Sequence, residues 1–174
     1  MNKMFTVIFA VSCFSFTACG EEVAYESAYI NSQSAWLTAK VSNGNAYVYR
    51  VEATAADGSG QATSLLVRED AVIQRTFKRY EDLDFRMGLL TEWTEEQSEI
   101  GAHDEGAAPL TVDDLYEACH GSVLNKGEGY QIAFEVDSRG ILKTCTYRAS
   151  GCAEDACTKG VRINEVIFMT EMGS

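Results

Sequence analysis

Four cysteines in the second half of the sequence are the residues whose type and spacing most directly suggest chemistry. Cys152 and Cys157 flank a short polar turn with a glycine beside it. Cys119 falls on the apolar stripe of a predicted helix, and Cys145 falls in a predicted strand. An even number of cysteines in an exported domain favours disulfides. We therefore predict that Cys119 pairs with Cys145 and that Cys152 pairs with Cys157.

A zinc site is the alternative use of these thiols. Cys119 and the adjacent His120 could bind zinc together with the later cysteines, because thiolates and imidazole are good zinc ligands. The sequence has no pair of cysteines separated by two residues, and an exported chain meets an oxidising environment. Disulfides are therefore favoured, and we expect neither a metal nor a cofactor.

The N-terminal residues have the pattern of a signal peptide. One lysine precedes an apolar run over residues 4–16 that contains no acidic residue, as in secretory signals. The run is shorter than the ~18 to 20 apolar residues that a membrane-spanning helix needs. We expect removal of residues 1–18, a short tether over residues 19–26, and a single domain over residues 27–174.

The sequence FTAC at residues 16–19 resembles the lipobox of bacterial lipoproteins, in which a cysteine after small residues is acylated and becomes the new N-terminus. Phe16 stands where that motif usually has leucine. The resemblance implies a lipid anchor on Cys19, and Gly20 in place of aspartate implies the outer membrane if the host has two membranes. Each buried methylene of an acyl chain contributes about 0.8 kcal/mol to membrane binding. The alternative is an ordinary secretory signal cut near Ala18, which leaves Cys19 free or paired.

Histidines and carboxylates, the usual acid–base groups, form no recognisable catalytic pattern. His103 lies in an acidic segment and is expected to be solvated, whereas His120 lies near a helix end, where it can interact with terminal carbonyls. Neighbouring carboxylates occur in predicted turns and at a helix start, at Asp82, Asp84, Asp113, Asp114, Glu154 and Asp155. Acid–base catalysis requires burial that shifts a pKa, so we expect these groups to be solvated. The acidic segments also lack the ligand spacing of an EF-hand calcium site.

The negative charge of the chain excludes nucleic acids as partners. The net charge is −12, and a nucleic acid needs a basic surface to neutralise its phosphates. An acidic surface normally serves solubility, although it can also attract a basic partner or cations.

Hydrophobic periodicity predicts a helix followed by strands in the first half. The segment 27–41 carries apolar residues at roughly helical spacing, namely Ile30, Trp36, Leu37 and Val41. Alternating patterns then predict strands over residues 46–53, 63–68, 71–80 and 85–93. Trp93, near the end of the last strand, is expected to pack on its own sheet; the alternative is a contact with a partner protein.

A small-residue and acidic segment separates the halves. Residues 95–109 cannot bury much apolar surface, so we expect an exposed loop there. Thr111 then resembles a helix N-cap, with Asp114 at the third helical position completing a capping box. After this helix, strands are predicted over residues 130–136, 141–148 and 161–169.

The order of elements predicts an α+β fold. We expect two units, each a helix followed by an antiparallel meander, with the helices packed on one face of the sheet. The other face would be open and available to a partner. This order of elements, with the TVDDLY helix, the YQIAFEVDSRGIL hairpin and the RINEVIF strand, resembles an uncharacterised family of bacterial lipoproteins defined by a domain of unknown function. The resemblance implies an envelope location and supplies no catalytic residue.

These features together favour a lipid-anchored, non-enzymatic cell-envelope protein that binds another envelope protein or serves as an accessory module. The membrane would be contacted through the lipid on Cys19. Two alternatives are an envelope hydrolase that uses acidic residues around the 95–109 loop and an inhibitor or sensor module for a secreted enzyme. An exposed apolar surface would favour binding, whereas a pocket with converging polar groups would favour catalysis.

Overall fold

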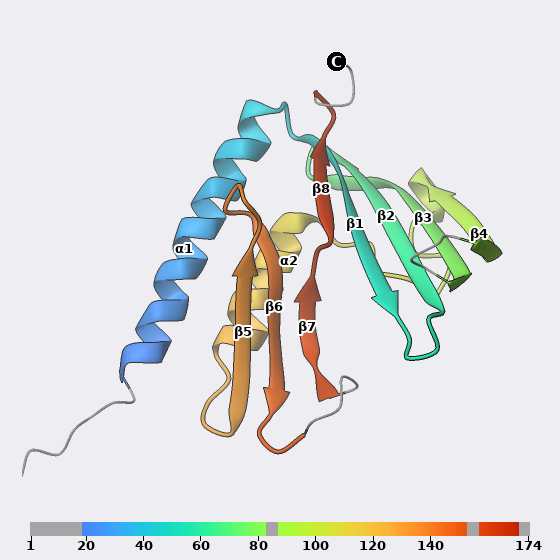
Figure 1. The fold of residues 1–174 in the computed structure, drawn as a ribbon. Helices are drawn as coiled ribbons and strands as arrows, with labels where there is room; N and C mark the ends of the chain where they lie inside the picture. The colour runs from blue at the N-terminus through green and yellow to red at the C-terminus, as the bar shows by residue number, and fades with distance from the viewer. Residues whose placement is uncertain (1–18, 83–86, 153–156, 171–174) are drawn as a thin grey trace, which may run out of the picture.

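The protein has the expected α+β architecture (Figure 1). The computed structural model describes residues 19–82, 87–152 and 157–170, with side chains from Tyr25 onward. The helices are α1 (Cys19–Ser42), the 3₁₀ turn η1 (Gln97–Glu99), α2 (Val112–Ala118) and the π-helical turn η2 (Cys119–Leu124). The strands are β1 (Ala46–Thr54), β2 (Gly60–Arg68), β3 (Ala71–Asp82), β4 (Met87–Glu96), β5 (Tyr130–Val136), β6 (Leu142–Ala149), β7 (Lys159–Arg162) and β8 (Glu165–Phe168). The predicted signal segment, Asp84, Glu154 and Asp155 lie outside the described residues, as does the side chain of Asp82.

The strands form two antiparallel sheets, and the last strand of the chain joins the sheet of the first half. The first sheet has the order β4-β3-β2-β1-β8 and the second has the order β5-β6-β7. Strand β8 belongs by sequence to the second half but pairs with β1, where Tyr49 lies opposite Val166. The chain passes from the second sheet to the first between β7 and β8. The Ile163 N–H still donates to the Lys143 carbonyl on β6, whereas the next N–H, of Asn164, donates to the Arg50 carbonyl on β1. The halves therefore interlock instead of forming separate units.

Helix α1 begins at Cys19, not after a tether at residue 27 as the sequence suggested. Glu21 and Glu22 extend it naturally, because glutamate has a high helix propensity and its charge is favourable near a helix N-terminus. The helix packs mainly against η2, β5 and β6, so it lies over the second sheet (Figure 1), and it also reaches the first sheet through Trp36, which contacts Tyr47 and Phe168.

The buried face of α1 differs from the predicted apolar stripe. Trp36 is fully buried and Tyr29 is buried one heptad earlier, whereas Ile30, Leu37 and Val41 are exposed. Successive helical residues project about 100° apart, so Trp36 and Leu37 cannot face the same core. The bulkier aromatic pair took the buried side, and the aliphatic stripe was left on the surface.

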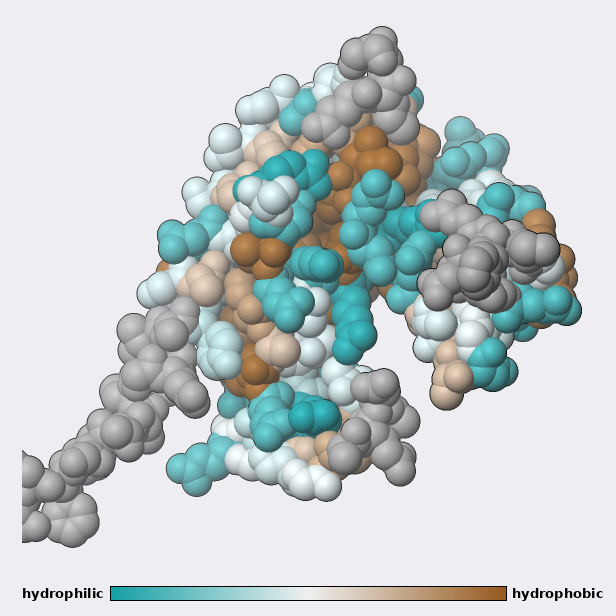
Figure 2. Space-filling view, viewed as in Figure 1, coloured by the Kyte–Doolittle hydropathy of each residue, from teal (hydrophilic) through white to brown (hydrophobic). Residues whose placement is uncertain are grey.

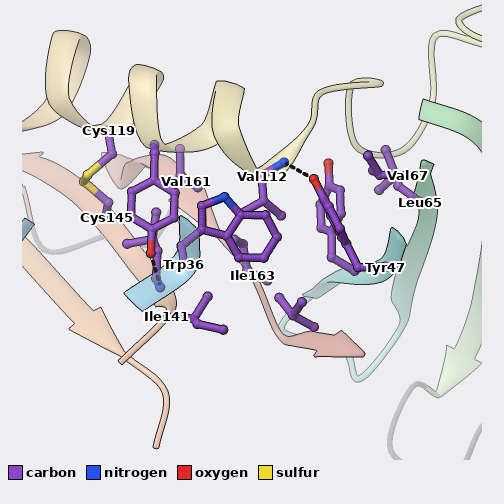
Figure 3. Packing of buried hydrophobic residues seen from close by; sticks show 14 of the residues in the cluster. Trp36, Tyr47, Leu65, Val67, Val112, Cys119, Ile141, Cys145, Val161 and Ile163 are labelled. Carbon is purple, nitrogen blue, oxygen red and sulfur yellow. Dashed lines mark hydrogen bonds between the residues drawn. A yellow bond between two sulfur atoms is a disulfide. The ribbon is translucent and has the colours of Figure 1, made fainter. Parts of the chain in front are cut away.

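One hydrophobic cluster draws residues from both sheets and both helices (Figure 3). The indole of Trp36 and the phenol of Tyr47 lie at its centre, with ring centroids 4.8 Å apart in an edge-to-face arrangement. The Tyr47 hydroxyl accepts a hydrogen bond of 3.1 Å from the Val112 N–H at the start of α2. An amide at a helix N-terminus has no partner within its helix, so this bond fixes α2 against β1.

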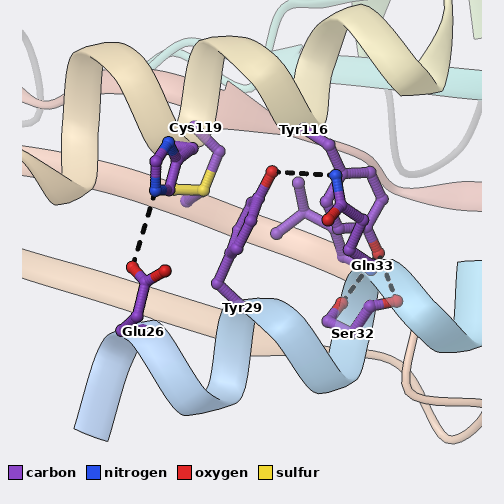
Figure 4. Close-up of a disulfide and its surroundings, with 9 residues drawn as sticks. Glu26, Tyr29, Ser32, Gln33, Tyr116 and Cys119 are labelled. Carbon is purple, nitrogen blue, oxygen red and sulfur yellow. Dashed lines mark hydrogen bonds and ion pairs between the residues drawn. A yellow bond between two sulfur atoms is a disulfide. The ribbon is translucent and has the colours of Figure 1, made fainter. Parts of the chain in front are cut away.

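Helix α2 carries the predicted capping box. The Thr111 side chain accepts from the Asp114 N–H, and the Asp114 carboxylate accepts from the Thr111 N–H. Tyr116 in the following turn is buried and its hydroxyl lies 2.7 Å from the Ser32 hydroxyl on α1. The same hydroxyl accepts from the Leu142 N–H at 2.9 Å, so Tyr116 joins α2 to α1 and β6 (Figure 4).

Two disulfides are present, and they join the pairs that the sequence favoured. Cys119 in η2 is bonded to Cys145 in β6, and both are fully buried. Cys152 is bonded to Cys157 across a short segment before β7. Disulfides form and persist in oxidising compartments, so the chain belongs to an extracytoplasmic environment.

Candidate functional site

A buried ion pair on the first sheet organises the acidic segment that follows β4. Arg75 on β3 and Glu95 on β4 are cross-strand partners. The Arg75 Nε lies 3.0 Å from Glu95 Oε2, and the two side chains are only 3% and 1% exposed. Buried charges require several hydrogen-bonding partners to offset their desolvation, and the loop over residues 97–110 supplies them.

The loop is therefore fixed to the sheet, although most of its residues are exposed, as expected. Glu95 accepts hydrogen bonds from the Gly101 N–H at 2.8 Å and the His103 N–H at 2.6 Å. Arg75 donates to the His103 carbonyl at 2.6 Å and to the Ala107 carbonyl at 3.2 Å. A folded segment of small and acidic residues is held here mainly by polar bonds to a buried pair, and Ala107 also packs against the hydrophobic core.

His103 is also held in place on one side, while its side chain remains 46% exposed to solvent, as expected. Its ring stacks on Trp93 with centroids 4.2 Å apart, and its Nδ1 lies 3.0 Å from Glu95 Oε1. Trp93 stacks in turn on Phe77, with centroids 5.2 Å apart, and the Arg75 guanidinium lies 4.7 Å from the centroid of its ring. Trp93 thus packs on its own sheet and under its own loop.

The contacts of this cluster indicate a structural role, in which the Arg75–Glu95 pair holds the loop on the sheet. Burial alone raises the pKa of Glu95, but the Gly101 and His103 N–H groups, the His103 ring and Arg75 together hold that pKa below its ordinary value. A carboxyl that remains ionised is a poor general acid near neutral pH. In the part of the chain that the structure describes, no hydrogen bond joins the His103 ring to a nucleophile. The pair consequently positions the loop. It supplies no arrangement of catalytic groups that would support the hydrolase alternative.

The remaining candidate carboxylates serve local structure. Asp113, expected to be solvated, accepts hydrogen bonds from Lys40 Nζ at 3.0 Å and from Trp36 Nε1 at 3.3 Å. Asp114 completes the capping box. Glu105 in the loop lies 2.7 Å from the Arg79 guanidinium, and both of these side chains are exposed.

The zinc alternative does not fit the structure. Cys119, Cys145, Cys152 and Cys157 are all in disulfides, so no thiolate remains among them to bind a metal. His120 lies 3.5 Å from Glu26 and packs on the ring of Tyr29 on α1, instead of meeting terminal carbonyls (Figure 4). Within residues 25–81, 88–152 and 157–170, no group of three metal-ligating side chains was found.

The open face of the first sheet was expected to bind a partner. Polar side chains on this face pair with one another instead. Lys78 lies 2.8 Å from Glu92, and the hydroxyls of Thr76 and Thr94 are 3.1 Å apart. In Figure 2 hydrophilic residues cover much of the visible surface over β1 and the strands beside it. Such a face is suited to water.

An apolar hollow lies instead at the end of that sheet. It has a volume of about 330 Å³ and is lined by residues of the β1–β2 hairpin such as Ala53 and Ala55, together with Tyr80 and Leu90. Leu89 and Leu90 on β4 are 49% and 56% exposed. Strand β4 ends the sheet order, so its outer backbone edge has no neighbouring strand among the described residues.

Sequence reasoning missed these leucines because hydrophobic alternation does not reveal where a strand pair is bulged. The pairing of β3 with β4 shifts between Arg79 and Tyr80, and a bulge changes which residues share a face. The sequence LL beside a glycine was the one local signal of an apolar edge.

Comparison with known proteins adds no relative: no protein-family model, curated protein or solved structure matches this chain. None of the helices in the described residues is long and apolar enough to span a membrane.

Proposed function

We propose that this chain is a lipid-anchored protein of the bacterial cell envelope, related to the lipoprotein family that its sequence resembles, and that it binds another envelope protein. The anchor would be the acylated Cys19, in the outer membrane if the host has two membranes. The lipobox-like sequence and the signal pattern support the anchor, and the disulfides agree with an exported domain.

The observation that carries the binding role is the apolar end of the first sheet. Leu89, Leu90 and the hollow beside them combine exposed apolar surface with an unpaired strand edge. An extended peptide can add to such an edge through backbone hydrogen bonds and place a side chain in a neighbouring pocket. The start of α1 and strand β4 lie on opposite sides of the molecule (Figure 1), so an anchored chain would present β4 away from its attachment.

The negative charge of the chain favours a partner segment that carries positive charge. The net charge is −12, and the β4 edge carries Glu96 in addition to the Glu92 that is paired with Lys78. Complementary charge speeds association and selects partners. The proposed partner therefore offers an extended segment that contains an apolar side chain and lysine or arginine residues.

The test is affinity recovery of the natively lipidated chain from its own membranes after crosslinking. We expect one stoichiometric partner with wild type and its loss with Leu90→Glu. Val136→Glu is the matched control, because Val136 is a similarly exposed aliphatic residue on β5 and its substitution should retain the partner. Equal recovery by wild type and Leu90→Glu, or no partner with wild type, would refute the binding role.

The anchor is tested separately by mass spectrometry of the mature N-terminus. We expect acylated Cys19 as the first residue and release of the Cys19→Ser chain from membranes. An unmodified N-terminus would refute the anchor while leaving the Leu90 experiment interpretable.

A further inference from the structure

From residue 27 onward, the outer face of α1 carries no exposed charge. Between residues 27 and 42 the only charged residue is Lys40. Its ammonium is buried, at 2.9 Å from Asp70 and 3.0 Å from Asp113. A helix on the surface of a soluble protein normally turns charged and polar residues toward water. Loss of charge in a chain with a net charge of −12 is instead typical of the core of a protein interface.

Exposed aliphatic side chains follow this face at coiled-coil spacing. Ile30, Leu37 and Val41 are 55%, 44% and 68% exposed. Together with the exposed Ser27 and Ser34 they recur at alternating intervals of three and four residues, which is the spacing of the contact positions in a two-helix seam. We call this set, Ser27, Ile30, Ser34, Leu37 and Val41, the α1 seam.

We propose that the α1 seam packs against the α1 seam of a second copy of this chain. A surface that meets itself across a two-fold axis must be complementary to itself, and a heptad seam satisfies this condition because side chains at equivalent positions interdigitate. Two copies repel each other, because each has a net charge of −12. The seam is an uncharged path along which they can approach.

A lipid surface is a poorer occupant for this face. Helices that lie in a membrane interface carry lysine and arginine beside a continuous apolar face. Here the exposed residues beside the seam are Glu26, Asn31 and Thr38, none of which is basic, and serines interrupt the aliphatic series. The net negative charge further opposes contact with anionic lipids.

The relative direction of the two helices rests on the proposed lipid anchor. Helix α1 begins at Cys19, so anchors in one leaflet bring the N-terminal ends of both helices to the same side. The paired helices are then parallel, and each seam residue lies opposite its own counterpart.

The expected strength of the pairing follows from the size of the seam. At about 1.5 Å per residue the seam is roughly 20 Å long, and it contains three aliphatic side chains. Stable dimers bury about 800 Å² on each partner, which is more than one such stripe supplies. Pairing is therefore weak in dilute solution and is promoted when two anchored copies share a membrane and a high effective concentration.

Cysteine crosslinking of the natively lipidated full chain in its own membranes tests the pairing. Mild oxidation should give a disulfide-linked dimer with Ser34→Cys, and also with Ser27→Cys and Val41→Cys expressed singly. Ser138→Cys, at an exposed position of the β5–β6 turn, is the control and should remain monomeric, as should wild type. Absence of dimers at all three seam positions would overturn the proposal, and a dimer formed only by mixing the Ser27→Cys and Val41→Cys chains would overturn the parallel direction.

A second variant separates the seam from nonspecific collisions. Leu37→Glu in the Ser34→Cys chain should reduce dimer yield at least about tenfold, because it places two like charges in the seam. Val136→Glu in the same chain should leave the yield unchanged. Equal losses with both would overturn the role of the seam. If Cys19 proves unacylated, the same comparison on the Cys19→Ser chain in concentrated solution still tests the pairing, so failure of the anchor and failure of the seam remain distinguishable.

Discussion

Arg75 and Glu95 are cross-strand partners whose side chains are almost completely buried, and they lie beneath the loop that their own sheet supports. The loop supplies backbone N–H groups to Glu95 and backbone carbonyls to Arg75. The strand pair and the loop therefore depend on each other, since each satisfies charges or polar groups that the other leaves unpaired.

Arg75→Met should destabilise the fold strongly. Removing one partner of a buried pair leaves an uncompensated charge and costs about 3–5 kcal/mol. Urea unfolding followed by tryptophan fluorescence measures this, because Trp93 lies against Arg75 and beneath the loop. Arg79→Met is the control: its pair with Glu105 is exposed, and such pairs contribute at most about 1 kcal/mol. Similar losses for the two variants would contradict the structural role of the buried pair.

Glu95 should make the fold sensitive to acid. Its pKa is lower in the folded chain than the ordinary carboxyl value, so its contribution to stability is fully present above about pH 4.3 and is lost as the pH falls through the folded pKa. The difference in unfolding free energy between wild type and Glu95→Gln should therefore shrink as the pH is lowered from about 5 to about 2. A constant difference across that range would show that Glu95 does not titrate with unfolding.

Gly106→Ala should release the loop from the sheet. Gly106 has a φ of +82°, and an added Cβ would lie 2.8 Å from Thr63 Oγ1 and 2.9 Å from the ring of Phe77. The left-handed backbone alone costs an alanine roughly 1–2 kcal/mol. Gly101→Ala separates that strain from the collision, because Gly101 has a φ of +89° and its nearest neighbour would lie 3.9 Å away. We expect faster amide exchange across residues 97–110 and a lower unfolding free energy for Gly106→Ala than for Gly101→Ala; equal values would exclude close packing at Gly106.

Local features of the fold were predictable from the sequence. The capping box of Thr111 and Asp114 uses residues three positions apart, and the alternation around Tyr47 and Tyr49 identifies β1 without knowledge of its neighbours. The disulfide pairing was also accessible, because Cys152 and Cys157 can close a small ring and leave the other two cysteines to pair.

Long-range features were not accessible in the same way. Nothing local to β8 indicates that it pairs with β1 across more than a hundred residues. Periodicity placed Trp36 and Leu37 on one apolar stripe of α1, and only long-range packing decides which of them is buried. The Trp36 ring lies against Tyr47 on β1 and Phe168 on β8, whereas Leu37 is exposed. Arg75 lies two residues before Phe77, so strand alternation places it on the same, core-facing side, but its partner Glu95 stood in a segment that composition marked as a loop.

The two disulfides should contribute unequally to stability. Cys119 and Cys145 are 26 residues apart, whereas Cys152 and Cys157 are 5 apart. In the chain-entropy description a crosslink stabilises by restricting the unfolded chain, and the restriction grows with loop length, to roughly 3.5 kcal/mol for the longer loop and roughly 2 kcal/mol for the shorter. The Cys119→Ala/Cys145→Ala chain should lose more, since it also removes buried sulfur contacts between η2 and β6. Urea unfolding of both double variants measures the difference, and a larger loss from removing the Cys152–Cys157 bond would show that the short ring holds structure beyond its own segment.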